Sequence, residues 1–520
     1  MSGQEERQHD GANDAPRGRD GLTGKVFRGS THQGMLGFLA QGLSLAQTMI
    51  LARVFFPEEF GTLAAALAYL HFFVNLGQHG ISKNLIREET LNAKTVGTAL
   101  ALSLGRDFAL LAIYLLGLVP FVTLFDRPDL MGYLLILAPL VMLNTLELPA
   151  AFLEREFRFK AVNIPRFIEL VTYPAIAVAL HASGIGEKSL FLAYTASFLL
   201  SRATLWFLFP VPLDFRFDRA AASRFASFSA PIMMAAAVTY LANKLDDLFV
   251  MSFAGEEALG YYALAFYKPM FIIALVNMVG SVLFSAFSRV RDESDRVRAY
   301  FVHGSRFLAM FVFPAGFLVA AFAEPIVVEL FSERWRPAAE LLRFFAIGIA
   351  LRVGLTALWI PLVTSRGPTR APLVSSIVDL GLLLALGLPL IARFGANGGA
   401  WYFVLHAVLS VWIVPLPAVR RIVGDLGYLR MLVLPLGATL LATAAALGLE
   451  QWMPGGGLPG LAAKGLACLT FYALLLLLGE RRSLPTALRF VRMAGAGPSI
   501  PNLRRGRFSG TLKSNRADHR

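Results

Sequence analysis

The sequence predicts an all-α protein that crosses a membrane many times. Of its 520 residues, 56% are hydrophobic and 16% are charged, and the mean hydropathy is +0.59. An ordinary soluble domain carries more charge and less apolar surface. Apolar stretches of about 20 residues, the length that a helix needs to span a bilayer, follow one another with short connections. The chain is therefore expected to form a polytopic helical bundle with no extramembrane domain.

Fourteen spans are predicted in chain order. Their approximate limits are 34–53, 60–81, 96–124, 130–152, 164–182, 188–210, 228–253, 259–287, 300–323, 338–363, 371–392, 397–418, 428–449 and 458–479. The expected parts of the chain are a disordered cytoplasmic tail (1–32), a first lobe of six spans (33–210), a cytoplasmic linker (211–227), a second lobe of six spans (228–420), two further spans (428–480) and a basic cytoplasmic tail (481–520). The division into lobes depends on an internal repeat.

The repeat is a short turn followed by an apolar helix. In the stretch PEEFGTLAAALA, Glu58 and Gly61 follow the first span, and Glu257 and Gly260 occupy the same places 199 residues later in EEALGYYALA. A period this long is typical of transporters with homologous halves. Because six spans return the chain to the same side, the two lobes are expected to be related by a pseudo-twofold axis along the membrane normal.

The distribution of charge predicts how the chain lies in the membrane. One set of alternate loops holds nineteen Lys or Arg and the other holds six, so the richer set and both termini are expected in the cytoplasm. The net charge of +13 comes largely from the tail after residue 480, which has ten Lys or Arg against one acid, so no nucleic-acid partner is expected. A single cysteine, Cys468, excludes an intrachain disulfide and a CxxC site.

The second span carries a polar stripe. His71, Asn75, Gln78 and His79 follow one helical face. The stripe either lines a hydrophilic cavity or hydrogen-bonds to neighbouring helices, as polar residues in membrane helices often do. The two histidines are two turns apart with no carboxylate near them in sequence, so neither a metal site nor a cofactor is expected.

The seventh span contains three charges inside an apolar run. Lys244 and Asp247 can pair on one helix face, while Asp246 points in another direction. Charges at such positions are costly and are functional candidates by default. One interpretation is a structural ion pair. The other is that Lys244 meets a substrate phosphate and that Asp246 or Asp247 takes up a proton or cation during transport.

Four more charges are candidates for the same cavity. Arg352 in span ten and Asp379 in span eleven either pair with each other or border the cavity of the second lobe, where Asp379 is a further candidate for ion coupling. Lys268 precedes Pro269, a combination that suits a kinked helix beside a cleft. Arg53, at the outer end of span one, either lines the cavity or reaches the lipid headgroups.

Several stretches resemble the Wzx-type polysaccharide flippases of the multidrug/oligosaccharidyl-lipid/polysaccharide exporter superfamily. They are ILARVFFPEEFGTLAAALAYL, ISKNLIREE, LEREFRF, FSAPIMMAAAVTYLANKLDDLFVMSFAGEEALGYYALA and SERWRPAAELLRFFAIG, and the similarity covers roughly residues 35–480. The resemblance implies a bacterial inner-membrane protein that flips a polyprenyl-diphosphate-linked oligosaccharide to the outer leaflet by alternating access. A polysaccharide polymerase and a chain-length regulator are candidate partners, besides the membrane lipids.

Two other functions remain open. A drug or cation antiporter of the same superfamily would need an anionic cavity, which Lys244, Lys268 and Arg352 disfavour. A membrane-embedded polymerase or sugar transferase would need a cluster of carboxylates or histidines in a sizeable loop, and every loop is short. The chain is therefore not expected to be an enzyme.

Overall fold

The computed structural model describes most of the chain between residues 36 and 479. The described residues are 36–37, 39–78, 81, 85, 92–156, 158–211, 217–267, 269, 272–273, 276, 280, 283–284, 286–288, 290, 293–367, 369–424, 428–453 and 455–479. Every regular element in this part is a helix, and nine of its helices are long and apolar enough to cross a membrane. The predicted class, an all-α polytopic membrane protein, is confirmed.

The first lobe is formed by the helices before residue 210. They are a helix over 39–54, α2 (Pro57–Gln78), α4 (Ala93–Leu124), α5 (Leu130–Leu137), η1 (Ala138–Met142), α6 (Leu143–Leu146), α7 (Leu148–Arg155), α8 (Phe159–Ala182) and α9 (Lys188–Leu208). Asn92 starts α4 by accepting a hydrogen bond from the Thr95 amide at 2.8 Å. Proline lacks an amide hydrogen, and prolines stand at the starts of η1 and α7, where the fourth predicted span is divided.

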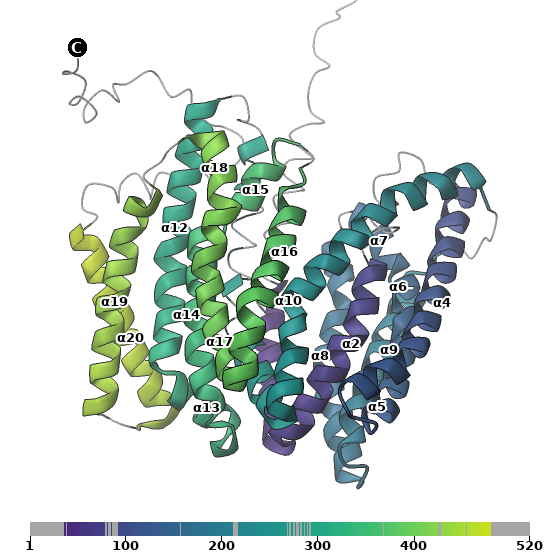
Figure 1. The fold of residues 1–520 in the computed structure, drawn as a ribbon, viewed down its shortest axis with the longest axis horizontal. Coiled ribbons are helices and arrows are strands. Elements are labelled where there is room, and N and C mark those ends of the chain that lie inside the picture. The colour runs from purple at the N-terminus through teal and green to yellow at the C-terminus, as the bar shows by residue number, and fades with distance from the viewer. Residues whose placement is uncertain are drawn as a thin grey trace, which may run out of the picture.

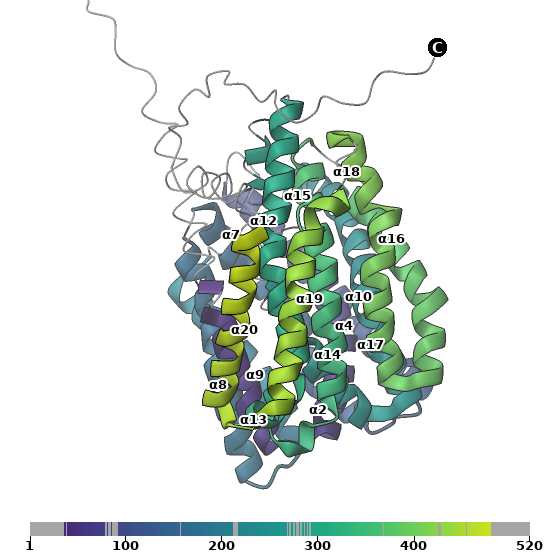
Figure 2. The same cartoon turned by 90° about the vertical axis from the view of Figure 1, so that its left-hand side faces the viewer.

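The second lobe and the two last helices follow. They are α10 (Arg219–Tyr267), α12 (Ser294–Ala321), α13 (Ala323–Phe331), η3 (Glu333–Trp335), α14 (Ala338–Thr356), α15 (Trp359–Thr364), α16 (Ala371–Leu382), η4 (Leu383–Gly387), α17 (Leu388–Ile413), α18 (Pro415–Val423), α19 (Tyr428–Trp452) and α20 (Gly457–Gly479). Helices α19 and α20 lie at the left edge of the molecule in Figure 1 and face the viewer in Figure 2, and both contact α12.

Two glycines make sharp turns between spans of the second lobe. Gly255 interrupts α10 with a φ of 85°, and Gly395 interrupts α17 with a φ of 58°. This left-handed region favours glycine because other residues meet steric strain there. The turns lie where the breaks after spans seven and eleven are predicted. Because α10 and α17 each continue as one element through these glycines, the division of the chain into fourteen spans stays a prediction.

Helix α10 links the two lobes. It begins at Arg219, inside the stretch expected to be a linker, because Ala221 and Phe225 bury their side chains against Leu100 and its neighbours in α4. From there it runs obliquely toward the lower end of the second lobe in Figure 1, and it packs along α2 on the way. The lobes converge at this lower end, where α13 lies, and α7 and α18 lie toward the upper end.

The repeated glycines bring the two lobes together at the lower end. A Cβ on Gly61 would lie 1.9 Å from the carbonyl oxygen of Glu256, and a Cβ on Gly260 would lie 1.9 Å from that of Pro57. Pro57 and Glu256 are also 199 residues apart, so each lobe presents the same positions to the other. Reciprocal contacts of this kind are produced by a twofold axis. Only glycine permits so close an approach of two backbones.

Polar contacts join the lobes around these glycines. Thr62 donates a hydrogen bond to Glu256 Oε2 at 3.0 Å, and Arg127 forms an ion pair with the same carboxylate. Trp335, which is fully buried, donates from Nε1 to the carbonyl oxygen of Ala52 at 2.8 Å. The lower end is therefore held by hydrogen bonds and charge as well as by backbone packing.

Candidate functional site

Lys244 and Asp247 form the ion pair that their spacing predicts. Nζ of Lys244 lies 2.7 Å from Oδ2 of Asp247, and the two side chains are 16% and 5% exposed. The ammonium also lies 4.6 Å from the ring centroid of Tyr267 and 5.2 Å from that of Phe266, within range for cation–π attraction. Tyr240, one turn earlier, donates to the carbonyl oxygen of Ala68 in α2 at 2.8 Å. The pair therefore lies close to the boundary between the lobes.

Asp246 points into the second lobe, away from this pair. Its Oδ2 accepts a hydrogen bond from the Tyr262 hydroxyl at 2.7 Å. Its Oδ1 is buried and has no hydrogen-bond partner in the described part of the chain. A buried carboxylate oxygen without a donor is costly, so this atom is suited to take up a proton or a cation.

Asp379 joins three helices of the second lobe. Its Oδ2 lies 3.7 Å from a guanidinium nitrogen of Arg352 on α14, and its Oδ1 lies 2.9 Å from Nε2 of His406 on α17. Tyr402 donates to the Asp379 carbonyl oxygen at 3.4 Å. The pairing of Arg352 with Asp379 was one of the two interpretations drawn from the sequence, whereas His406 was not identified.

The stripe in α2 is partly used for contacts inside the first lobe. His71 Nε2 lies 3.1 Å from the Tyr194 hydroxyl on α9, and the Asn75 side chain donates to the His71 carbonyl oxygen at 2.8 Å. The Gln78 side chain, His79 and Lys268 lie outside the part of the protein that the structure describes.

Arg53 lies at the lower end of the molecule. It donates from a guanidinium nitrogen to the carbonyl oxygen of Glu329 at 3.1 Å, in an exposed position. This contact ties the first helix to α13 of the second lobe. A place on the cavity wall stays a prediction for Arg53.

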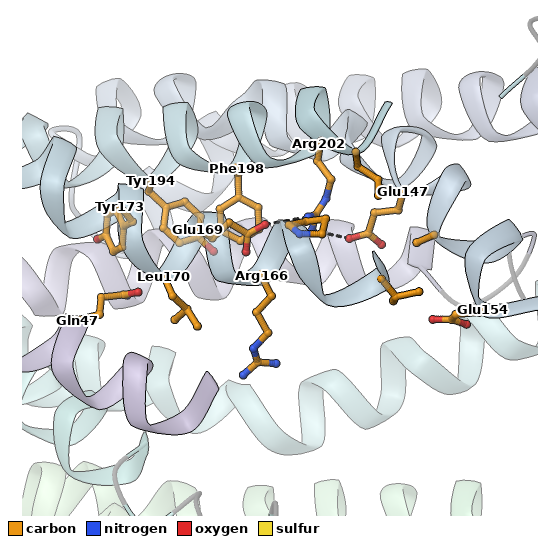
Figure 3. A pocket seen from close by; sticks show the side chains of 14 residues that line it. Gln47, Glu147, Glu154, Arg166, Glu169, Leu170, Tyr173, Tyr194, Phe198 and Arg202 are labelled. Atoms are coloured by element: carbon orange, nitrogen blue, oxygen red, sulfur yellow. Dashed lines mark hydrogen bonds and ion pairs between the residues drawn. The ribbon is translucent and has the colours of Figure 1, made fainter. Parts of the chain in front are cut away.

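The first lobe contains a cavity of about 480 Å³ beside α8 and α9 (Figure 3). Its lining combines charged, aromatic and apolar side chains: Gln47, Glu147, Ala150, Glu154, Val162, Pro165, Arg166, Glu169, Leu170, Tyr173, Tyr194, Phe198, Arg202 and Leu205. This volume is in the range of small-molecule sites. Because Tyr194 also contacts His71, the cavity is connected to the polar stripe of α2.

A network of charges forms one wall of this cavity. Arg202 lies 2.8 Å from Glu169 Oε1 and 2.7 Å from Glu147 Oε1, and the Ser201 hydroxyl donates to Glu169 at 2.7 Å. Arg166 extends away from this network in Figure 3 and forms no ion pair or hydrogen bond with a described residue. The sequence reasoning missed Glu169 and Arg202, although single charges of opposite sign in neighbouring spans were a usable signal.

The two lobes carry charged triads at matching helices. In the first lobe the triad is Glu147, Glu169 and Arg202, from predicted spans four, five and six. In the second lobe it is Arg352, Asp379 and His406, from spans ten, eleven and twelve. The predicted spans correspond in order between the two lobes, but the charges of the triads do not. The first triad is formally anionic, and the second contains a histidine that can gain a proton.

Three curated proteins are similar to this chain at 23–26% identity. The lipopolysaccharide biosynthesis protein WzxC of Escherichia coli (strain K12) is 23% identical over 64% of this chain and 69% of that protein. The succinoglycan biosynthesis transport protein ExoT of Rhizobium meliloti (strain 1021) is 24% identical over 59% and 62%. The teichuronic acid biosynthesis protein TuaB of Bacillus subtilis (strain 168) is 26% identical over 50% and 53%.

Solved structures show the same fold. The lipid II flippase MurJ in an inward closed conformation superposes with a TM-score of 0.70 at 14% identity, over 87% of this chain and 99% of that one. An inward-facing multidrug resistance MATE family transporter superposes with a TM-score of 0.59 at 15% identity, over 74% and 94%.

Family models match most of the membrane-embedded chain. The model described as lipid II flippase MurJ matches residues 243–467. The model described as polysaccharide biosynthesis protein matches residues 50–340, more than half of the chain. On this match, the chain belongs to the polysaccharide biosynthesis protein family.

Proposed function

We propose that this protein flips a polyprenyl-diphosphate-linked oligosaccharide from the cytoplasmic to the outer leaflet of the bacterial inner membrane, for cell-surface polysaccharide export. The observation that carries the proposal is the set of charged side chains buried within both lobes of a transporter fold and at the boundary between them. A diphosphate-linked sugar head loses its hydration in hydrocarbon, whereas its lipid tail does not. Buried polar groups between two lobes replace that hydration while the tail stays in the bilayer.

Lys244 is the proposed contact for the diphosphate. It lies near the lobe boundary, and its partner Asp247 can hold it in place while no substrate is bound. Further contacts for the diphosphate-linked sugar head along its path are proposed at Arg352, Lys268, Arg53, His71, Asn75 and Gln78. Each would supply a hydrogen bond or a positive charge in place of water.

The membrane potential favours the outward movement of this cargo. An inside-negative potential of 100 mV would favour the transfer of two negative charges by about 4.6 kcal/mol, since each charge contributes about 2.3 kcal/mol. Asp246, Asp247 and Asp379 are the proposed groups for additional coupling to protons or sodium. Asp246 is the strongest of them, because its Oδ1 is buried without a hydrogen-bond partner among the described residues.

In the proposed orientation the upper end of Figure 1 faces the cytoplasm. The excess of Lys and Arg in alternate loops separately predicts that both termini are cytoplasmic. The lobes converge at the outer end, so the described conformation would correspond to a state closed toward the outside. Alternation would require the contacts of Gly61 and Gly260 to separate and reform.

The test is a deletion of the gene in its host, with surface polysaccharide and the sidedness of the linked oligosaccharide as measurements. We expect the oligosaccharide to accumulate on the cytoplasmic side and the wild-type protein to clear it. Lys244→Ala is expected to complement poorly. Unchanged polysaccharide together with raised drug sensitivity would instead support a drug or cation antiporter. A polymerase and a chain-length regulator are proposed partners. Loss of export without accumulation of the linked oligosaccharide on the cytoplasmic side would indicate that the defect lies with these partners.

A further inference from the structure

The cavity of the first lobe differs chemically from the Lys244 region. Two arginines and three glutamates line it, so its formal charge is negative. Inside a membrane-embedded lobe such a lining disfavours a diphosphate. The cavity is therefore expected to bind a different class of ligand from the diphosphate that is expected at Lys244.

Its polar groups are arranged to meet hydroxyl groups. Arg166 forms no hydrogen bond or ion pair with a described residue, although its charge acts on Glu169, and Glu169 still has an oxygen that no described hydrogen bond uses. The Tyr173 hydroxyl and Arg202 Nε are buried beside the cavity, and neither has a partner in the described part of the chain. A sugar hydroxyl both donates and accepts, so it can satisfy guanidinium, carboxylate and phenol groups at once.

Its aromatic side chains supply the apolar half of such a site. Tyr173, Tyr194 and Phe198 line the cavity together, and the rings of Tyr194 and Phe198 lie 4.6 Å apart between centroids. The C–H face of a pyranose ring is apolar and packs on aromatic surfaces. An aromatic wall beside charged hydrogen-bonding groups is therefore suited to a carbohydrate.

We infer that this cavity is a sugar-recognition subsite, which binds neutral or weakly charged sugar residues of the oligosaccharide while Lys244 meets the diphosphate. The inference rests on the proposed function and adds to it the place where the glycan is selected. Arg166 and Tyr173 are the proposed specificity-determining residues. Arg202 holds Glu147 and Glu169 in place and acts as a positioning residue.

The test uses the purified full-length protein in lipid nanodiscs on an array of bacterial oligosaccharides that carry no lipid and no diphosphate. We expect the wild type to bind a subset of these glycans. Tyr173→Phe and Arg166→Gln should each lower the apparent affinity about tenfold, the effect of losing one hydrogen bond to a charged or buried group. Tyr261→Phe and Arg370→Gln are the matched controls, since both residues lie outside the cavity lining.

The thermal stability of the same variants separates recognition from folding. The Tyr173 hydroxyl has no partner in the described structure, so Tyr173→Phe should melt at the same temperature as the wild type or higher. Array binding that is absent in the wild type, or unchanged in both cavity variants, would overturn the inference. Competition by inorganic pyrophosphate that depends on Arg166 would also overturn it, because the cavity would then hold the diphosphate. If deletion of the gene still blocks export in that case, the proposed function stands and only the sugar subsite fails.

Discussion

At the scale of single residues, the charges inside this protein are held in compact groups. Lys244 is paired with Asp247 at 2.7 Å, and Asp379 lies between Arg352 and His406. An isolated charge in a membrane span is expensive, and a partner lowers that cost. The pairing alone does not distinguish a structural bridge from a substrate contact, and a matched set of variants does.

Removal of one partner of the Lys244–Asp247 pair is expected to destabilise the protein. Lys244→Met leaves the Asp247 carboxylate unpaired, and Asp247→Asn leaves the ammonium unpaired, each at a cost of about 3–5 kcal/mol. The double variant Lys244→Met/Asp247→Asn removes both charges of the pair together, so its melting temperature should recover relative to either single variant. If Lys244 contacts the substrate, the double variant should remain unable to restore export. Full export by the stable double variant would leave the pair with a structural role only.

Asp246→Asn tests ion coupling without removing a hydrogen bond. The asparagine can still accept from Tyr262, so the melting temperature should change little. Transport in proteoliposomes should lose its dependence on an imposed proton or sodium gradient, because the amide cannot change its charge. Normal transport by Asp246→Asn and Asp247→Asn, with and without a gradient, would rule out coupling through these two residues.

At the scale of elements, the contact between α2 and α10 decides how closely the lobes approach. Both Gly61 and Gly260 lie against backbone of the other helix, where a Cβ would overlap a carbonyl oxygen. By contrast, Gly105 in α4 has open space where a Cβ would stand. A glycine-to-alanine substitution is therefore expected to push the helices apart at Gly61 or Gly260 and to be tolerated at Gly105.

Gly61→Ala is expected to weaken the lower end. Its methyl group would meet Glu256 backbone, so the helices must move apart and the hydrogen bond from Thr62 to Glu256 would lengthen. The melting temperature should fall and export should decrease. Gly105→Ala should keep both, with a gain of up to about 1 kcal/mol from helix propensity. Equal behaviour of the two variants would show that the close approach at Gly61 is not needed.

At the scale of the whole molecule, the lobes form two units that converge at one end (Figure 1). Alternating access requires this end to separate once in each cycle. The Thr62–Glu256 hydrogen bond crosses the boundary there, whereas the bond of 2.7 Å from Tyr133 to Glu187 stays within the first lobe. The two pairs offer a test of lobe movement with an internal control.

A crosslink across the boundary is expected to stop transport. In a Cys468→Ser background, Thr62→Cys with Glu256→Cys would be joined by a short, cleavable thiol crosslinker, and flipping would be measured before and after cleavage. We expect loss of transport and recovery on cleavage, because the outer end can then open. The pair Tyr133→Cys with Glu187→Cys should transport in either condition. Undiminished flipping by the crosslinked boundary pair would contradict alternating access at this end.

The sequence by itself determined the features that depend on composition and local geometry. Hydropathy predicted the all-α membrane class, the echo around Gly61 and Gly260 picked out two positions at which the helices approach most closely, and helical spacing predicted the pairing of Lys244 with Asp247. Each of these follows from residues that are neighbours in the chain or that repeat along it. The turns at Gly255 and Gly395 were also located to within a few residues.

Only the tertiary structure decided which distant residues meet. Glu147 and Arg202 are 55 positions apart, and Asp379 and His406 are 27 apart, so their contacts depend on the rotation and tilt of packed helices. Hydropathy shows that a helix is buried in the membrane but does not show which face it turns to which neighbour. For that reason the cavity of the first lobe, the two charged triads and the reciprocal glycine contact emerged from packing and could not be derived from the order of residues alone.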